Sequence, residues 1–193
     1  MSETRLTDNE KKILLEFART SIVRAVRKKP LPKTEGFEGS LNEPGAAFVT
    51  VHVNKELRGC YGFINAIYPL PEAIQDVGVK AALDDPRFDP VRPEELKDMD
   101  VEISVLTPPE KISSIEEIQI GVHGLIIESK INRGLLLPHV ATEYGWDREQ
   151  FLDHTALKAG LPPKAWKEKN VILYKFTTDT FSESQFANMK GAN

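Results

Sequence analysis

The sequence predicts an α+β fold with antiparallel or mixed sheets. Strand-like runs of apolar and β-branched residues come mostly as neighbouring pairs joined by short turns, as at 47–53 and 57–64. Segments with helical periodicity lie between these pairs rather than after every strand. This order favours hairpins packed against helices over a doubly wound parallel sheet.

The N-terminal segment predicts a long amphipathic helix followed by a loop. Thr7 and Glu10 have the spacing of a capping box, and apolar residues then recur at helical intervals, which predicts a helix over 8–28. Pro30 ends the pattern. Residues 30–46 hold three prolines and three glycines in seventeen positions, which is the composition of a loop.

The next segment predicts a hairpin, a helix and a strand. AFVTVHV at 47–53 and LRGCYGFI at 57–64 form the two arms of the hairpin. Pro71 suits the first turn of a helix that ends before Pro86. In VEISVLT at 101–107, apolar and polar residues alternate as in a half-buried strand.

The C-terminal half also predicts a hairpin and helices. Capping residues, glycines and prolines mark the ends of its elements. They predict, in order, a short helix at 113–118, a hairpin with strands at 125–129 and 134–138, helices at 138–145 and 147–160, and a last strand at 171–176.

The composition is that of an ordinary globular protein and excludes several classes of function. The chain of 193 residues has 40% hydrophobic residues, a net charge of -4 and one cysteine. Its length fits one domain or two interlocked subdomains. A single thiol rules out internal disulfides and Cys-rich metal sites, and the acidic balance disfavours nucleic acid as a partner. Without a signal peptide or a run of ~20 apolar residues, we expect a cytoplasmic protein that meets no membrane.

The segment LRGCYG has the highest density of chemically capable residues. Gly59 and Gly62 can let a ligand or another backbone approach closely, or place a bulge, and Arg58 can bind a carboxylate or phosphate. Cys60 then becomes a candidate nucleophile whose pKa is lowered by Arg58 or by backbone N–H groups. In the alternative interpretation, Cys60 is a small buried hydrophobe and Arg58 is a surface charge.

Three further residues are candidates for the same site. His123 stands in the turn GVHG and can serve Cys60 as a base, or it can bond to the local backbone. Arg87 lies beside an aromatic residue and either closes over a ligand or anchors its loop. Glu102 lies on a strand and faces either solvent or a cleft.

The sequence predicts neither a metal nor a cofactor. His139 and Glu143 share one face of a predicted helix, but no third ligand is near them, which favours a surface pair. Walker A, GxGxxG and GxSxG motifs are absent from the sequence.

Over nearly its whole length the sequence resembles the AMMECR domain family. The resemblance rests on AFVTVHV followed by LRGCYG, and then on DDPRFDPVRPEEL, VEISVLT, GVHGLIIE, LLPHVATEYGWD and FLDHTALKAGL in this order. Tyr61 stands where the family hexapeptide has isoleucine. The resemblance implies two α+β subdomains with a cleft between them. It also implies a pathway shared with a Memo-like protein and a radical SAM protein.

Two functional hypotheses follow from different classes. In the first, Arg58, Gly59, Gly62, Arg87 and Glu102 bind a small anionic or peptidic ligand in a cleft, with Cys60 and His123 as catalytic residues. In the second, the chain is a non-catalytic adaptor that binds a protein partner, and the LRGCYG segment is structural.

Overall fold

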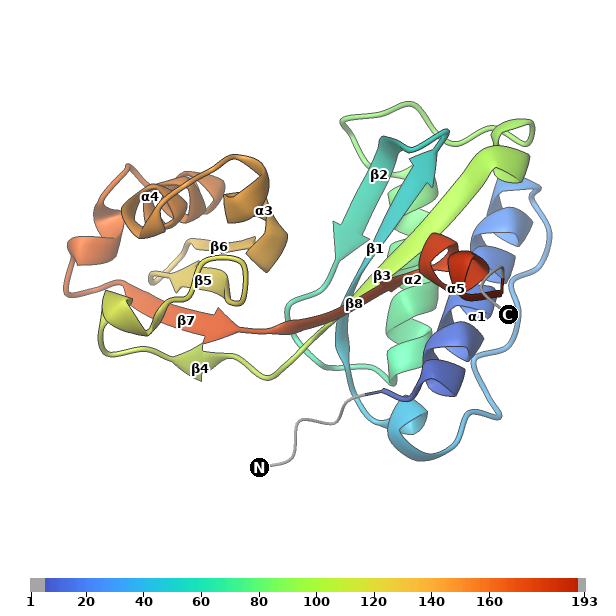
Figure 1. The fold of residues 1–193 in the computed structure, drawn as a ribbon, viewed down its shortest axis with the longest axis horizontal. Coiled ribbons are helices and arrows are strands. Elements are labelled where there is room, and N and C mark those ends of the chain that lie inside the picture. The colour runs from blue at the N-terminus through green and yellow to red at the C-terminus, as the bar shows by residue number, and fades with distance from the viewer. Residues whose placement is uncertain (1–5, 191–193) are drawn as a thin grey trace. The chain divides into compact units, whose positions relative to one another are not determined.

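The computed structural model describes residues 6–190, which fold into two compact units. The first unit contains the described parts of residues 1–105 and 179–193, so both ends of the chain contribute to it. The second unit contains residues 106–178. Each unit combines a four-stranded sheet with helices, which confirms the α+β prediction (Figure 1). No helix in this part of the chain is long and apolar enough to cross a membrane.

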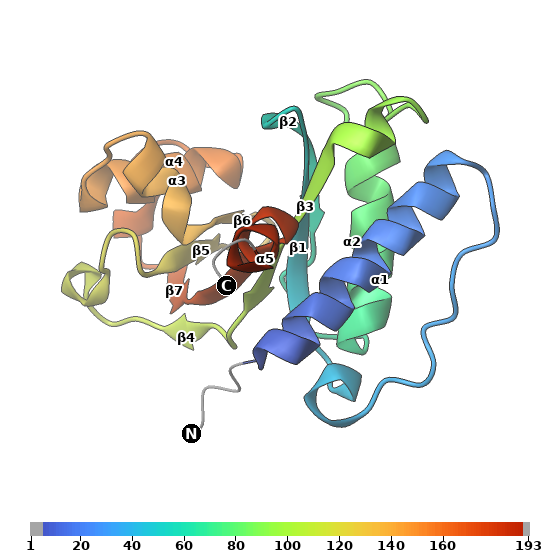
Figure 2. The same ribbon diagram turned by 45° about the vertical axis from the view of Figure 1, so that its right-hand side comes forward.

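The first sheet has the strand order β2-β1-β3-β8 and carries α1 (Asp8–Val26) and α2 (Leu70–Leu83) on one face (Figures 1 and 2). Its strands β1 and β2 form an antiparallel hairpin. The elements of this unit are α1 (Asp8–Val26), a 3-10 turn (Gly39–Asn42), β1 (Ala46–Val53), β2 (Glu56–Gly62), α2 (Leu70–Leu83), a second 3-10 turn (Glu95–Asp98), β3 (Met99–Leu106), β8 (Thr178–Ser182) and α5 (Glu183–Lys190).

Helix α1 forms where the sequence predicts it. Thr7 caps its N-terminus, and the reciprocal bond from Glu10 completes the capping box. Leu14, Ala18 and Ile22 recur every four residues and are fully buried, since they form the stripe that packs onto α2 and the sheet. The loop that follows is fixed through Phe37, whose ring packs edge-on against Phe17 at 5.0 Å.

The two faces of the first sheet differ in polarity because side chains alternate along each strand. Val49 and Val51 of β1 are fully buried against the helices. The opposite face carries polar side chains at the intervening positions, such as Thr50 of β1. It also carries Ser104 of β3 and Thr180 of β8, whose hydroxyl oxygens lie 2.9 Å apart. We call this the polar face.

The second sheet has the order β4-β7-β5-β6, and all of its paired strands are antiparallel. Its core consists of buried residues from β5 and α4 together with Trp166. The elements of this unit are β4 (Glu110–Lys111), a 3-10 turn (Ile115–Glu117), β5 (Gly124–Glu128), β6 (Arg133–Leu136), α3 (Pro138–Glu143), α4 (Arg148–Lys158), a second 3-10 turn (Ala165–Lys167) and β7 (Ile172–Phe176).

The prediction that 171–176 is the last strand is wrong. Strand β8 follows directly and pairs with β3 in the first sheet, and helix α5 follows β8. The segment TTDTFSES lacks the pattern of a strand, because only Phe181 enters the core while the threonines of β8 and Ser182 lie on the polar face. A strand with one apolar residue has the composition of a turn.

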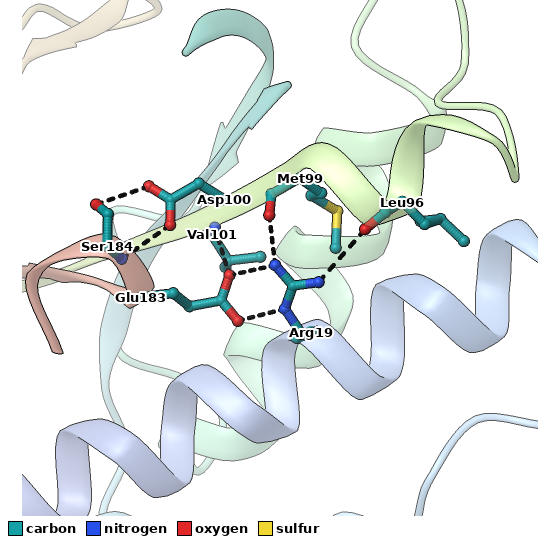
Figure 3. A network of polar contacts seen from close by, with 7 residues as sticks. All are labelled: Arg19, Leu96, Met99, Asp100, Val101, Glu183 and Ser184. Atoms are coloured by element: carbon teal, nitrogen blue, oxygen red, sulfur yellow. Dashed lines mark hydrogen bonds and ion pairs between the residues drawn. The ribbon is translucent and has the colours of Figure 1, made fainter. Parts of the chain in front are cut away.

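The start of α5 is fixed to α1 and β3 by a polar network (Figure 3). Arg19 of α1 forms a two-pronged ion pair with Glu183 through Nε and Nη2, and it also donates to the Met99 carbonyl. The Glu183 carboxylate accepts a 2.9 Å bond from the backbone N–H of Val101. Ser184 donates from its N–H and its hydroxyl to Asp100, both at 3.0 Å. The network joins segments that lie more than 75 residues apart in the chain.

Candidate functional site

The LRGCYG segment forms most of β2, and its register contains a bulge. Val51 pairs with Gly59 and the next residue, His52, pairs with Leu57, so Arg58 is an extra residue on β2. A bulge redirects the side chain at the inserted position. The bulge that the glycine spacing suggested is therefore present, and it lies at Arg58.

The two glycines of the segment make room for the protein's own atoms. A Cβ at Gly59 would lie 1.8 Å from the carbonyl oxygen of Ala81 in α2, and a Cβ at Gly62 would lie 2.2 Å from the ring of Phe48. Both distances are far shorter than any van der Waals contact. The structure thus supports the close approach of another backbone at Gly59, and it fills the space that a ligand would need beside either glycine.

Arg58 is bonded to the loop after α2. Its Nε and Nη2 atoms bond to the two carboxylate oxygens of Glu95 at 2.9 and 3.1 Å. Its Nη1 and Nη2 atoms also donate to the carbonyls of Asp89 and Pro90. These bonds tie the loop after α2 to the bulge, and they occupy the fork that was expected to bind a ligand.

The most connected group near Cys60 is Asp85, whose role the sequence analysis missed. Its buried carboxylate accepts bonds from the backbone N–H of Cys60 at 2.9 Å and from the N–H of Arg87 at 3.1 Å. The guanidinium of Arg87 binds the same carboxylate at 3.0 and 2.7 Å. The ion pair and these N–H donors hold the pKa of Asp85 well below its usual range. The Asp-Pro-Arg triplet after a helix was the available signal, because an Asp side chain often bonds to the N–H two residues on.

Cys60 lies on the polar face, half-buried, and its thiol has a raised pKa. The hydroxyl of Thr50 donates to its Sγ at 3.3 Å. Burial is the main cause of the raised pKa, and the negative charges of Asp85 and Glu102 add to it, while Thr50 and the Arg87 guanidinium act in the opposite direction. The expected lowering by Arg58 is wrong, because that guanidinium is paired with Glu95.

Glu102 and Arg87 are the two predicted residues that the structure places in the electrostatic surroundings of Cys60. Glu102 is half-buried on β3, at a position whose side chain points away from the helices. Arg87 is held by Asp85, yet 55% of its side chain is exposed. It also lies 5.3 Å from the ring centre of Phe88. Asp85 thus anchors Arg87 to its loop, and the guanidinium still reaches solvent.

His123 belongs to the second unit, whereas Cys60 belongs to the first. The ring Nδ1 of His123 accepts a 3.1 Å bond from the backbone N–H of Gln119. The backbone N–H of His123 donates to the Gln119 carbonyl at 3.0 Å. Burial, followed by the charge of Lys175, lowers its pKa. These contacts match the interpretation of His123 as a turn histidine bonded to local backbone.

Within residues 6–190, no group of three or more His, Cys, Asp or Glu side chains is placed to hold a metal ion. His139 and Glu143 both lie exposed on α3. His154 is stacked on the ring of Trp146 at 3.8 Å instead.

The comparisons with known proteins agree on one family. The AMMECR1 family model matches residues 15–181. A protein of Thermococcus onnurineus is 44% identical over 190 residues, with 93% of each chain covered. Protein MJ0810 of Methanocaldococcus jannaschii is 44% identical over 186 residues, with 92% of each covered. The crystal structure of an uncharacterized protein, PH0010 of Pyrococcus horikoshii, superimposes with a TM-score of 0.86 at 41% identity, covering 92% of this chain and 93% of that one. The chain therefore belongs to the AMMECR1 family.

Proposed function

We propose that the chain binds a small peptidic ligand on the polar face of the first sheet, beside Cys60. One observation carries this proposal. The Arg87 guanidinium, which is held by Asp85 yet still exposed, and the Glu102 carboxylate both lie in the electrostatic surroundings of the Cys60 thiol. Arg87 is oriented through Nε and Nη2 by Asp85, and among residues 6–190 no hydrogen bond to its Nη1 is seen, which leaves that edge for a ligand carboxylate. Glu102 places a negative charge near Cys60 as well.

The balance of charges favours a zwitterionic ligand over a simple anion. The surroundings of Cys60 contain one guanidinium, Arg87, and two carboxylates, Asp85 and Glu102. A ligand with only negative charge would be repelled by Asp85 and Glu102, whereas a ligand with a carboxylate and an amine would present a charge of each sign to this mixed surface. The ends of a short peptide have this chemistry.

The raised pKa of Cys60 favours binding over nucleophilic catalysis. A thiol that stays protonated at neutral pH is a poor nucleophile, and Asp85 and Glu102 disfavour its thiolate further. Catalytic roles for Cys60 and His123 stay predictions. A catalytic role for Cys60 requires that a bound ligand lower the pKa of the thiol. The ligand would do so by placing groups that stabilise the thiolate beside it.

The experiment that tests the binding proposal uses Cys60 as its own reporter, since it is the one cysteine of the sequence. Iodoacetamide labelling is timed with and without a mixture of tripeptides at millimolar concentration. N-acetylglycine and glycinamide serve as one-ended probes. We expect the tripeptides to slow labelling and each one-ended probe to act weakly. Arg87→Gln and Glu102→Gln should each abolish the protection, while the exposed control Arg92→Gln should keep it. Equal protection in all variants, or none in the unmodified chain, overturns the proposal.

The adaptor hypothesis is supported by a different observation. Ile67 and Tyr68, in the connection between β2 and α2, expose 65% and 48% of their surface. Single exposed apolar side chains are common, but two adjacent ones form the start of an apolar patch of the kind that protein partners bind. Ile67→Ser with Tyr68→Ser should then abolish binding to the Memo-like or the radical SAM protein that the family resemblance implies, and Cys60→Ala should leave it intact. The reverse pattern would contradict an adaptor role.

A further inference from the structure

The second unit contains a hollow of about 300 Å³ beside strand β4. This is the lower end of the volume range of small-molecule sites. Its wall combines cationic, hydroxyl and aromatic side chains, among them Lys111, Ser113, Ser114, Trp166, Lys167 and Lys169. All of them belong to the second unit, so the hollow is distinct from the Cys60 region.

The charge of the hollow is positive although the whole chain is acidic. Three lysines line it and no Asp or Glu does, against a net charge of -4 for the protein. Lys111 and Lys169 have no salt bridge to the described residues, and Lys167 lies 3.7 Å from an exposed Glu149. Exposed ion pairs of this length are weak. Among the described residues, Lys111 and Lys169 thus have no neutralising carboxylate, and that of Lys167 is a weak partner.

Four glutamates lie close to lining residues in the sequence: Glu110 and Glu168 are exposed, Glu116 pairs with Arg148, and Glu117 is neutralised by several partners. The Glu117 carboxylate accepts the backbone N–H groups of Ser113 and Ser114 at 2.9 and 3.2 Å. It also pairs with Lys175 at 3.2 Å. These partners lower the pKa of Glu117 and neutralise its charge, and Lys175 is not one of the lining lysines. The two backbone N–H groups are thereby used, so the ammonium and hydroxyl groups are the donors that remain.

One wall of the hollow is rigid and aromatic. The indole N–H of Trp166 donates to the Asp153 carboxylate at 2.6 Å, which fixes the ring. The Nζ of Lys167 lies 4.5 Å from the centre of the same ring, within the range of a cation–π interaction. An ammonium held over a fixed ring is oriented before any ligand arrives, which lowers the entropic cost of binding.

We propose that this hollow is a second binding site, for a small molecule that carries two or more phosphate or carboxylate groups. Two separated anionic groups match lysines that come from two segments of the lining, β4 and residues 166–169. A single anion would leave at least one ammonium without a partner. The proposal is independent of the peptidic site, because it involves none of the residues around Cys60.

Trp166 gives a direct signal for the test. The sequence has two tryptophans, so in the variant Trp146→Phe all of the tryptophan fluorescence comes from Trp166. Pyrophosphate and tricarballylate are titrated into this variant, and inorganic phosphate and acetate serve as the single-anion controls. Calorimetry on the unmodified chain repeats the titrations without any substitution. We expect the multivalent probes to change the Trp166 signal and to bind at least about tenfold more tightly than the single anions.

The matched variants separate a site from general charge attraction. Lys111→Gln, Lys167→Gln and Lys169→Gln are combined in one chain, and the exposed residues Lys97, Lys130 and Lys158 are changed in the same way in another. Both chains lose three positive charges. The first should bind pyrophosphate at least about tenfold more weakly, and the second should bind it as the unmodified chain does. Equal weakening in both, or no binding to the unmodified chain, overturns the proposal. Preference for pyrophosphate or for tricarballylate distinguishes phosphate from carboxylate ligands.

Discussion

The carboxylate of Asp85 accepts a 2.9 Å hydrogen bond from the backbone N–H of Cys60. Strand β2 lies at the edge of its sheet, where an N–H group would otherwise be open to pairing with another chain. Because Asp85 also holds Arg87 through two bonds, one buried carboxylate sets both the strand edge and the cation beside the thiol.

Asp85→Asn should destabilise the protein by about 1–3 kcal/mol, since it removes the charge that pairs with Arg87 and weakens the bond to Cys60. Urea unfolding followed by circular dichroism measures the change. Its neighbour Asp84 is exposed, so Asp84→Asn is the matched control and should change the stability little. The same loss in both variants would contradict a special role for Asp85.

The contribution of Asp85 should also depend on pH. Its pKa is lowered in the folded state, so the folded protein binds fewer protons there than the unfolded chain. The stabilisation is complete above the ordinary pKa of about 4 and is lost as the pH falls toward the folded value. The difference in free energy of unfolding between the unmodified protein and Asp85→Asn should therefore be constant from neutral pH to about pH 5 and should narrow below about pH 4. A gap that widens in acid would contradict this assignment.

The pH profile of Cys60 alkylation should have its midpoint above the ordinary pKa of a thiol, because burial disfavours the thiolate. Two variants should shift it in opposite directions. Glu102→Gln removes a repelling charge and should lower the midpoint, whereas Arg87→Gln removes a stabilising one and should raise it. A midpoint at or below the ordinary value would instead support Cys60 as a nucleophile.

Gly59→Ala and Gly78→Ala should have effects of opposite sign. A methyl group at Gly59 would overlap the Ala81 carbonyl, so we expect a loss of about 3 kcal/mol or more. At Gly78, in the middle of α2, the nearest atoms lie 3.6 Å away, which leaves room for a methyl group. Alanine favours the helix there by up to about 1 kcal/mol. Thermal and urea unfolding measure the stability of both variants. A Gly59→Ala variant as stable as the unmodified protein would contradict the packing role of Gly59.

Glu183→Ala should destabilise the first unit by about 1–3 kcal/mol, because Arg19 would lose its ion pair and the Val101 N–H would lose its acceptor (Figure 3). Glu16→Ala, an exposed glutamate on α1, is the control and should be near neutral. Limited proteolysis should also cut α5 faster in Glu183→Ala than in Glu16→Ala. Equal stability and equal cutting would show that the network contributes nothing to docking α5.

Much of the fold follows from local patterns that act within a few residues. The Thr7–Glu10 capping box is formed, and the Asp147–Gln150 box likewise begins α4. The hairpin of β1 and β2 lies within two residues of its predicted bounds. Caps, helical stripes and strand alternation depend on near neighbours, so the sequence by itself determined these elements and the α+β class.

The tertiary structure decided what depends on residues far apart in the chain. It gave Arg58 the partner Glu95 rather than Cys60. It placed β8 in the first sheet, although Phe181 is the one residue of that strand in the apolar core and the sequence pattern therefore does not predict a strand there. It also decided the state of the thiol. A pKa reflects burial and every charge nearby, and for Cys60 those charges come from the loop after α2 and from β3. No local pattern specifies which distant segment will fill that space, and for that reason the sequence located Cys60 but not its chemistry.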